Sequence, residues 1–158
     1  MRSKLSKRII LIIVSLGLIG LLTVAYFYFM PHRNVVGMGS DFQMTSTALV
    51  DEYISNADQA NDKYLNEEGE SKIIEVTGTV FSVTKDMNEQ NVVLLKSPNA
   101  KAGVSCTFIA ETNNQAEALQ IGDDVTVKGV IRSGAGYDAD LDMYEDVILE
   151  KCNIENEK

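Results

Sequence analysis

Apolar residues form one uninterrupted run near the start of the chain. Residues 9–30 carry no charge, and the run ends in aromatic residues, as transmembrane helices often do at the membrane interface. Its 22 residues would reach roughly 33 Å as a helix, enough to cross a hydrocarbon core of ~30 Å. Basic residues dominate 1–8, which favours a cytoplasmic amino terminus. We therefore expect a transmembrane helix over 9–30, with the remainder of the chain outside the cytoplasm.

A cleaved signal peptide is the alternative for the same segment. Signal peptides have a shorter apolar region followed by small residues at the cleavage site, whereas this run ends in the bulky "YFYFM". Cleavage would change how the protein is attached but not the side of the membrane. After the run, 31–43 contains a proline and two glycines without a sustained period, so we expect a tether there.

A helical period follows the tether. Over 45–65 an apolar stripe recurs at three- and four-residue spacing, and Thr45 or Ser46 can cap the amino end of the helix. Such a stripe either packs on its own domain or binds another helix, and we favour the first. The stripe consists of Leu49, Tyr53, Ala57, Ala60 and Tyr64.

Alternating strand patterns replace the helical period after residue 70. They cover 73–83, 91–95, 103–109, 124–131 and 143–154, with a short helical pattern around 113–121. Five short strands with a helix between the third and fourth is the order of the OB-fold barrel. We therefore predict an all-β fold with helices: a five-stranded OB-fold barrel, preceded by the amphipathic helix, over 44–156.

Glycine interrupts the first and fourth of these strands at Gly78 and Gly129. A small closed barrel must coil these two strands sharply, and a glycine within a strand permits a bulge or tight bend. We expect both residues to be corner glycines rather than ligand-binding ones.

Several segments resemble the tRNA anticodon-binding-like OB-fold family, which comprises small exported or membrane-anchored bacterial proteins. The matching segments span most of 48–152 and are "ALVDEYISNADQANDKYL", "IEVTGTVFSV", "VSCTF", "LQIGDDVTVKGV" and "DVILEKC". The resemblance implies the barrel, the helix in front of it, and export. Together with the expected transmembrane helix, export predicts a location at the bacterial cell membrane. It implies no activity, because the family has no established common biochemistry.

The net charge of the predicted domain limits the kinds of partner that it can bind. Residues 1–40 hold five basic residues and no acid, so the remainder carries 14 − 5 = 9 Lys and Arg against 23 Asp and Glu, a net charge of −14. Such a surface repels phosphate backbones, whereas OB folds bind single strands through a basic groove with stacking aromatics. We expect a protein, peptide or small molecule as the ligand, with single-stranded nucleic acid as the alternative.

No catalytic constellation is recognisable. The only histidine, His32, falls in the tether, so a histidine-based catalytic group is not available to the barrel. We expect a non-catalytic protein without a cofactor.

The expected contact surface is the outer face of the first three strands, flanked by the loop before the last strand; its residues are Thr77, Thr79, Phe81, Ser105, Thr107, Tyr137 and Tyr144.

Both cysteines, Cys106 and Cys152, lie in strands that neighbour each other in an OB barrel. An oxidising compartment favours a disulfide between them; the alternatives are two buried thiols or a redox role.

The loop before the last strand contains Asp138, Asp140 and Asp142, a spacing that suits hard cations such as Ca²⁺. The EF-hand pattern fails there, because Met143 stands where its glycine is needed. A solvated acidic edge is therefore favoured over a calcium-stabilised module.

Overall fold

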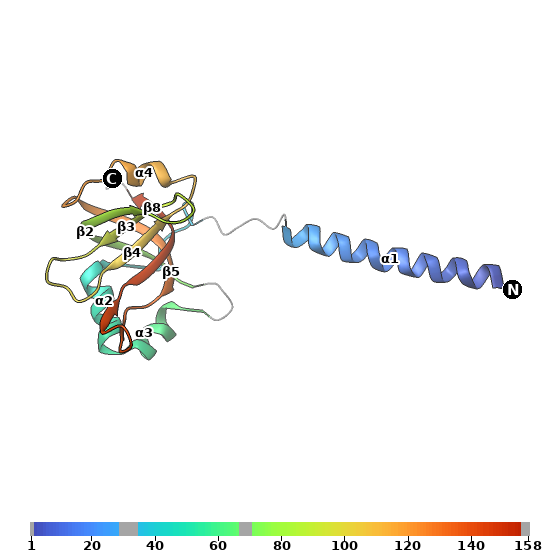
Figure 1. Cartoon of the computed structure of the whole chain (residues 1–158), viewed down its shortest axis with the longest axis horizontal. Coiled ribbons are helices and arrows are strands. Elements are labelled where there is room, and N and C mark those ends of the chain that lie inside the picture. The colour runs from blue at the N-terminus through green and yellow to red at the C-terminus, as the bar shows by residue number, and fades with distance from the viewer. Residues whose placement is uncertain (1, 29–34, 67–70, 156–158) are drawn as a thin grey trace. The chain divides into compact units, whose positions relative to one another are not determined.

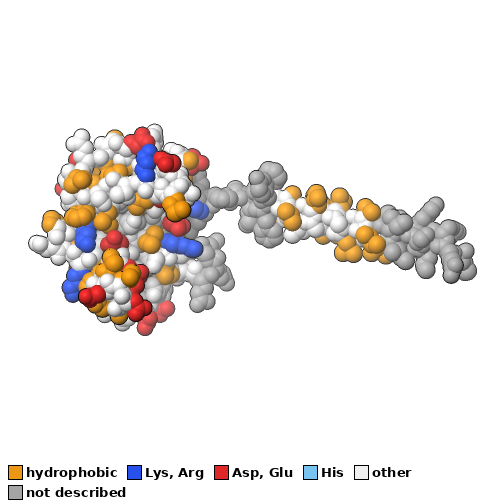
Figure 2. Space-filling view, viewed as in Figure 1, with side chains coloured by type: hydrophobic (Ala, Val, Ile, Leu, Met, Phe, Trp, Pro, Cys, Tyr) orange, Lys and Arg blue, Asp and Glu red, His pale blue; other side chains and the backbone are white. Residues whose placement is uncertain are grey.

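The computed structural model describes residues 2–28, 35–66 and 71–155, and it divides the chain into two compact units, 1–34 and Val35–Lys158. In the first unit, α1 (Arg2–Tyr28) is a single helix whose apolar side chains are exposed over residues 12–26 (Figure 2). Among the described residues, no helix combines the length and the apolarity needed to cross a membrane. The anchor expected over 9–30 therefore stays a prediction.

The second unit is a closed, mostly β barrel with a few helices (Figure 1). Its strands lie in the order β2-β3-β4-β8-β5, and pairing of β2 with β5 closes the ring. Only β4 and β8 are parallel neighbours within the ring. The five-stranded barrel predicted from the strand order is confirmed. The strands are β2 (Ile73–Lys85), β3 (Asn91–Leu95), β4 (Val104–Phe108), β5 (Asp124–Ser133) and β8 (Val147–Glu155).

The described part of the expected tether is bound to the barrel. Residues 31–34 lie outside the described residues, but Val35 is buried and β1 (Phe42–Thr45) pairs in parallel with β2. Lys128, on the outer face of β5, is also buried: its ammonium donates to the carbonyl oxygen of Val36 at 3.3 Å and contacts Glu155 at 2.5 Å. The domain therefore begins earlier than its hydrophobic pattern indicates.

Two helices, not one, precede the barrel strands. α2 (Ser46–Ser55) begins at the Thr45 cap, whose hydroxyl accepts a hydrogen bond from the Ala48 amide at 3.2 Å. It ends at Asn56, which has an extended backbone, and the Asn56 side chain then caps α3 (Ala57–Tyr64). The single helix expected over 45–65 is wrong at this point, because an asparagine that can cap the next helix stabilises a break.

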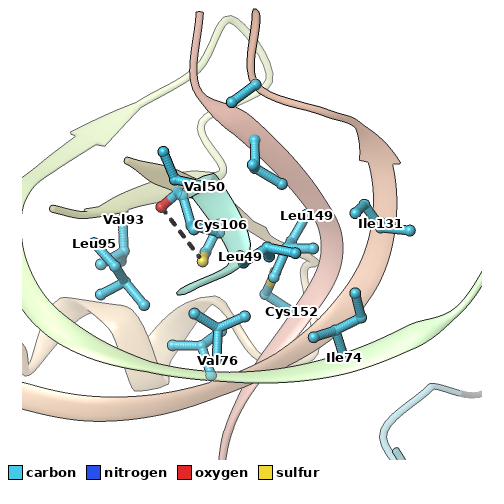
Figure 3. Packing of buried hydrophobic residues seen from close by; sticks show 14 of the residues in the cluster. Leu49, Val50, Ile74, Val76, Val93, Leu95, Cys106, Ile131, Leu149 and Cys152 are labelled. Carbon is cyan, nitrogen blue, oxygen red and sulfur yellow. Dashed lines mark hydrogen bonds between the residues drawn. The ribbon is translucent and has the colours of Figure 1, made fainter. Parts of the chain in front are cut away.

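The apolar stripe of these helices packs on its own domain, as favoured from the sequence. Leu49 and Val50 reach the core beside Cys106 and the inward side chains of the strands (Figure 3). Tyr53 and Tyr64 are buried, and burial raises the pKa of Tyr53 to about 12. Among the described residues, all buried hydrophobic side chains lie between Val35 and Cys152, so this core belongs to the second unit.

The two strand glycines have different roles. Gly129 lies at a register shift between β5 and β8, and a Cβ there would come within 2.7 Å of the Cys152 sulfur. Gly78 lies in regular pairing with β5, and its missing side chain leaves room for the Ser46 hydroxyl, 2.6 Å from where a Cβ would be. Gly129 is the corner glycine that was expected, whereas Gly78 permits α2 to approach the barrel wall.

Candidate functional site

An aromatic pair, with Tyr137 exposed and Tyr144 half-buried against the core, lies on the hairpin formed by β6 (Gly136–Asp138) and β7 (Met143–Glu145). Tyr137 and Tyr144 face each other across the two strands with ring centroids 5.1 Å apart, and Tyr137 is 54% exposed. The Lys101 ammonium lies 5.1 Å from the Tyr144 ring centroid and 3.3 Å from its hydroxyl. The hairpin therefore offers a rigid aromatic surface that already holds one cation.

Ser105 lines a small hollow at the base of this hairpin. The hollow has a volume of about 280 Å³. It lies on the outer face of the barrel, where Ser105 and Ser133 both pair with Ile148 of β8. Thr107 follows two residues later on the same face of β4. The hollow is lined by Ser105, Ser133, Glu145, Asp146 and Ile148.

Thr77 and Thr79 lie on another part of the barrel wall. Their strand pairs there with β5, and each hydroxyl is hydrogen-bonded to it: Thr77 to Thr126 at 2.9 Å and Thr79 to Asp124 at 2.6 Å. Phe81 is 48% exposed and lies at the bulge where β2 changes partner from β5 to β3. The structure thus brings Tyr137 and Tyr144 into contact, but Thr77 and Thr79 line none of the hollow at the hairpin.

Thr77 instead lines a larger groove of about 650 Å³ at one end of the barrel. α4 (Asn113–Glu117) covers this end, and the groove lies between that helix and the ends of β5 and β8. The hydrophobic pattern of the sequence does not indicate this groove, although the shortness of the helical pattern near 113–121 is a signal for it. The lining residues are Thr77, Gln115, Ala118, Leu119, Asp124, Val125, Thr126, Ile154 and Glu155.

The two cysteines are free thiols buried in the barrel core (Figure 3). Burial, and then a hydrogen bond with Cys106, raises the pKa of the Cys152 thiol well above its ordinary value. A protonated, buried thiol is a poor nucleophile, so the arrangement suits packing or a structural crosslink. The disulfide between Cys106 and Cys152 stays a prediction.

The acidic loop forms the turn of the hairpin. Asp138 accepts hydrogen bonds from the amides of Asp140 at 2.8 Å and Leu141 at 3.1 Å, and Asp142 accepts one from the Tyr137 hydroxyl. This last bond raises the pKa of Tyr137. Across the described ranges, no three His, Cys, Asp or Glu side chains are grouped so that they could hold a metal ion. Asp138 and Asp142 therefore have a visible structural use, in ordering the turn.

A charged cluster joins the two helices in front of the barrel. The Lys63 ammonium lies 2.9 Å from the Glu52 carboxylate, which also accepts a hydrogen bond from the Tyr64 hydroxyl at 2.7 Å. The hydrogen bond with Lys63, followed by that with Tyr64, lowers the pKa of Glu52. The hydrogen bonds with Tyr64 and Glu52 raise the pKa of Lys63. This cluster links α2 to α3, and its three side chains are paired with one another.

The chain is similar in structure to a protein from Klebsiella pneumoniae described as a "putative nucleic acid-binding lipoprotein", with a TM-score of 0.54 and 17% identity over 80% of this chain and 100% of that one. At that identity the likeness shows the fold alone. No protein with curated annotation is significantly similar in sequence. The model of the tRNA_anti-like family matches residues 1–141. Since this match covers most of the chain, the protein belongs to the tRNA_anti-like family.

Proposed function

We propose that this protein is a non-catalytic binding module, anchored in the bacterial cell membrane by α1, whose barrel binds a protein, peptide or small molecule outside the cytoplasm. The observation that carries the proposal is the aromatic pair of Tyr137 and Tyr144 beside the Ser105 hollow. The exposed Tyr137 ring is held in place by the half-buried Tyr144, and an aromatic side chain ordered in this way provides contact area at low entropic cost. Family membership supports a binding role, because the fold is used for binding by many of its bearers.

Two features support attachment to a membrane. The apolar side chains of α1 are exposed over residues 12–26, and such a surface is stable only in apolar surroundings. The Klebsiella protein of similar fold is described as a lipoprotein, a class of protein held at membranes by an acyl chain. We place the amino terminus in the cytoplasm because basic residues precede the helix. Protease treatment of intact and permeabilised spheroplasts tests this: cleavage of the barrel only after permeabilisation would refute the proposed topology.

Capture of partners from an envelope extract tests the binding role. The full chain in detergent, tagged at its amino end, is compared with a Tyr137→Ser/Tyr144→Ser variant. A matched control is Met87→Ser, because Met87 is a fully exposed apolar residue on the β2–β3 turn, away from the hairpin. We expect a partner that is retained by the wild type and the control and lost by the double variant. Equal capture by all three chains would refute the hairpin as the binding surface.

Single-stranded nucleic acid is the second candidate, favoured by the description of the Klebsiella protein. Against it stands the net charge of −14 after residue 40, which weakens attraction to phosphates. Titration of fluorescent single strands at low salt decides between the two. Tight binding that weakens steeply as salt is added would replace the proposed protein or small-molecule ligand by nucleic acid.

A further inference from the structure

The groove under α4 exists because a short helix covers the end of the barrel incompletely. α4 has only five residues, less than two turns. Leu119, Val125 and Ile154 pack against the core, yet each stays partly exposed and lines the groove. Ile121, two residues after Leu119, is 76% exposed. Aliphatic side chains of the core therefore continue onto the surface at this end of the molecule.

Acidic and hydroxyl groups border these aliphatic side chains. Thr77, Thr126 and Glu155 lie in one row across β2, β5 and β8, with Asp124 beside them. Among the residues that the structure describes, no lysine or arginine lines the groove. Glu155 contacts the Lys128 ammonium, but no ion pair joins Asp124 to a basic residue within the described chain. The groove thus combines an apolar floor with a rim of hydroxyl groups and two carboxylates, of which Glu155 is paired with Lys128 and Asp124 supplies the negative charge.

We propose that this groove binds a peptide segment of a partner protein that combines aliphatic side chains with Lys or Arg. The apolar floor favours aliphatic side chains, because burying them removes their surface and that of the floor from water. The rim favours Lys or Arg and opposes acidic partners by charge complementarity. A volume of about 650 Å³ lies within the range of ligand pockets, so it can take a few side chains but not a folded domain.

This site is separate from the hairpin surface of the proposed function. The groove and the Ser105 hollow share no lining residue, and only Thr77 was among the contact residues expected from the sequence. Loss of peptide binding at the groove would therefore leave partner capture through Tyr137 and Tyr144 intact. The converse also holds, so the two proposals can fail independently.

Fluorescence anisotropy with labelled peptides tests the groove. The barrel domain (residues 35–158), which contains every buried hydrophobic residue that the structure describes, is titrated with a 12-residue peptide of alternating Leu and Lys and with a matched peptide of Leu and Glu. The decisive variant is Asp124→Asn, and its control is Asp140→Asn on the hairpin turn. Both variants lower the negative charge equally, so they separate a local contact from general attraction. Leu119→Gln tests the floor, with Met87→Gln, at an exposed apolar side chain on the β2–β3 turn that lines neither depression, as its control.

We expect the Leu/Lys peptide to bind saturably and to shift backbone amide resonances of residues 115–126, while the Leu/Glu peptide does not bind. Asp124→Asn and Leu119→Gln should each weaken binding on the order of tenfold, and the two controls less than about twofold. Equal weakening by Asp124→Asn and Asp140→Asn would overturn the proposal, and so would equal binding of both peptides or no binding. Sedimentation showing a dimer that the groove variants dissociate would assign the groove to a second copy and overturn it as well. If Leu119→Gln does not fold, the Asp124 pair decides alone.

Discussion

Replacing Gly129 by alanine tests whether this glycine is needed for close packing or for backbone freedom. Gly129 is buried in β5, and a Cβ there would lie 2.7 Å from the Cys152 sulfur, closer than real Cβ contacts allow. Its next neighbours are the Glu150 carbonyl oxygen and the Leu149 Cβ, both at 3.2 Å. Its φ does not lie in the left-handed region, so an alanine fits the backbone but collides with the sulfur.

The magnitude follows from two opposed effects. Alanine lowers the entropy of the unfolded chain and so stabilises by about 0.4–1 kcal/mol. Overpacking of a filled core costs about 1–3 kcal/mol. The middle of the two ranges differs by about 1.3 kcal/mol, so we expect Gly129→Ala to lower the free energy of unfolding by about 1–2 kcal/mol. With an m-value of about 2 kcal/mol/M in urea, the midpoint should fall by roughly 0.5–1 M.

A double-mutant cycle identifies the cause. Urea unfolding of the barrel domain under reducing conditions is measured for Gly129→Ala, Cys152→Ala and the pair. Removing the sulfur should relieve the collision, so we expect a favourable coupling of about 1–2 kcal/mol between the two substitutions. Gly136→Ala is the control, because a Cβ at Gly136 meets no atom within 4 Å. If Gly129→Ala costs the same with and without the sulfur, the packing explanation is refuted.

Four further outcomes follow from contacts described above. Asn56→Ala, which removes the cap of α3, should lower the free energy of unfolding by about 1 kcal/mol in urea titrations, and an unchanged midpoint would contradict the break at this residue. Under oxidising conditions the predicted disulfide between Cys106 and Cys152 should stabilise by roughly 3–4 kcal/mol over the reduced protein, and Cys152→Ala should abolish the difference; two titratable thiols after oxidation would disprove it. Because its bond with Lys63 lowers the folded pKa of Glu52, the stability from Glu52 is present above its ordinary pKa of 4.5 and is lost as pH falls through the folded value. Melting below pH 4.5 should therefore depend less on pH in Glu52→Gln, and identical profiles would count against the pair. Chelator should leave the melting temperature unchanged, whereas a drop would restore the calcium alternative.

Strand order and inward positions were predictable because they depend on local pattern. A period of two identifies strands, and the position of a short helix between the third and fourth strands selects one barrel topology. The Thr45 cap was predictable for the same reason, since capping involves residues three positions apart. The break at Asn56 was not, because the apolar stripe runs on across it from Tyr53 to Ala60.

The candidate site was less accessible to sequence reasoning. Tyr137 and Tyr144 could be selected as aromatic residues of one loop, but their pairing needed the register of β6 and β7. Thr77 and Ser105 both point outward from their strands, yet they line different depressions. In a closed barrel the outward direction changes from strand to strand, so outward residues of different strands can face different sides of the molecule. Alternation gives the face of a strand but not the direction in which that face points.

By itself, the amino-acid sequence determined the division into an apolar amino-terminal run and an acidic domain, and the closed five-stranded barrel of that domain. These properties follow from composition and from contacts between residues close in the chain. Only the tertiary structure decided that Lys128 is buried under the segment at Val36, that Gly129 makes room for Cys152, and that the groove under α4 stays open. Each of these depends on how side chains from segments distant in the sequence pack together. Hydrophobic periodicity along the chain does not specify that packing.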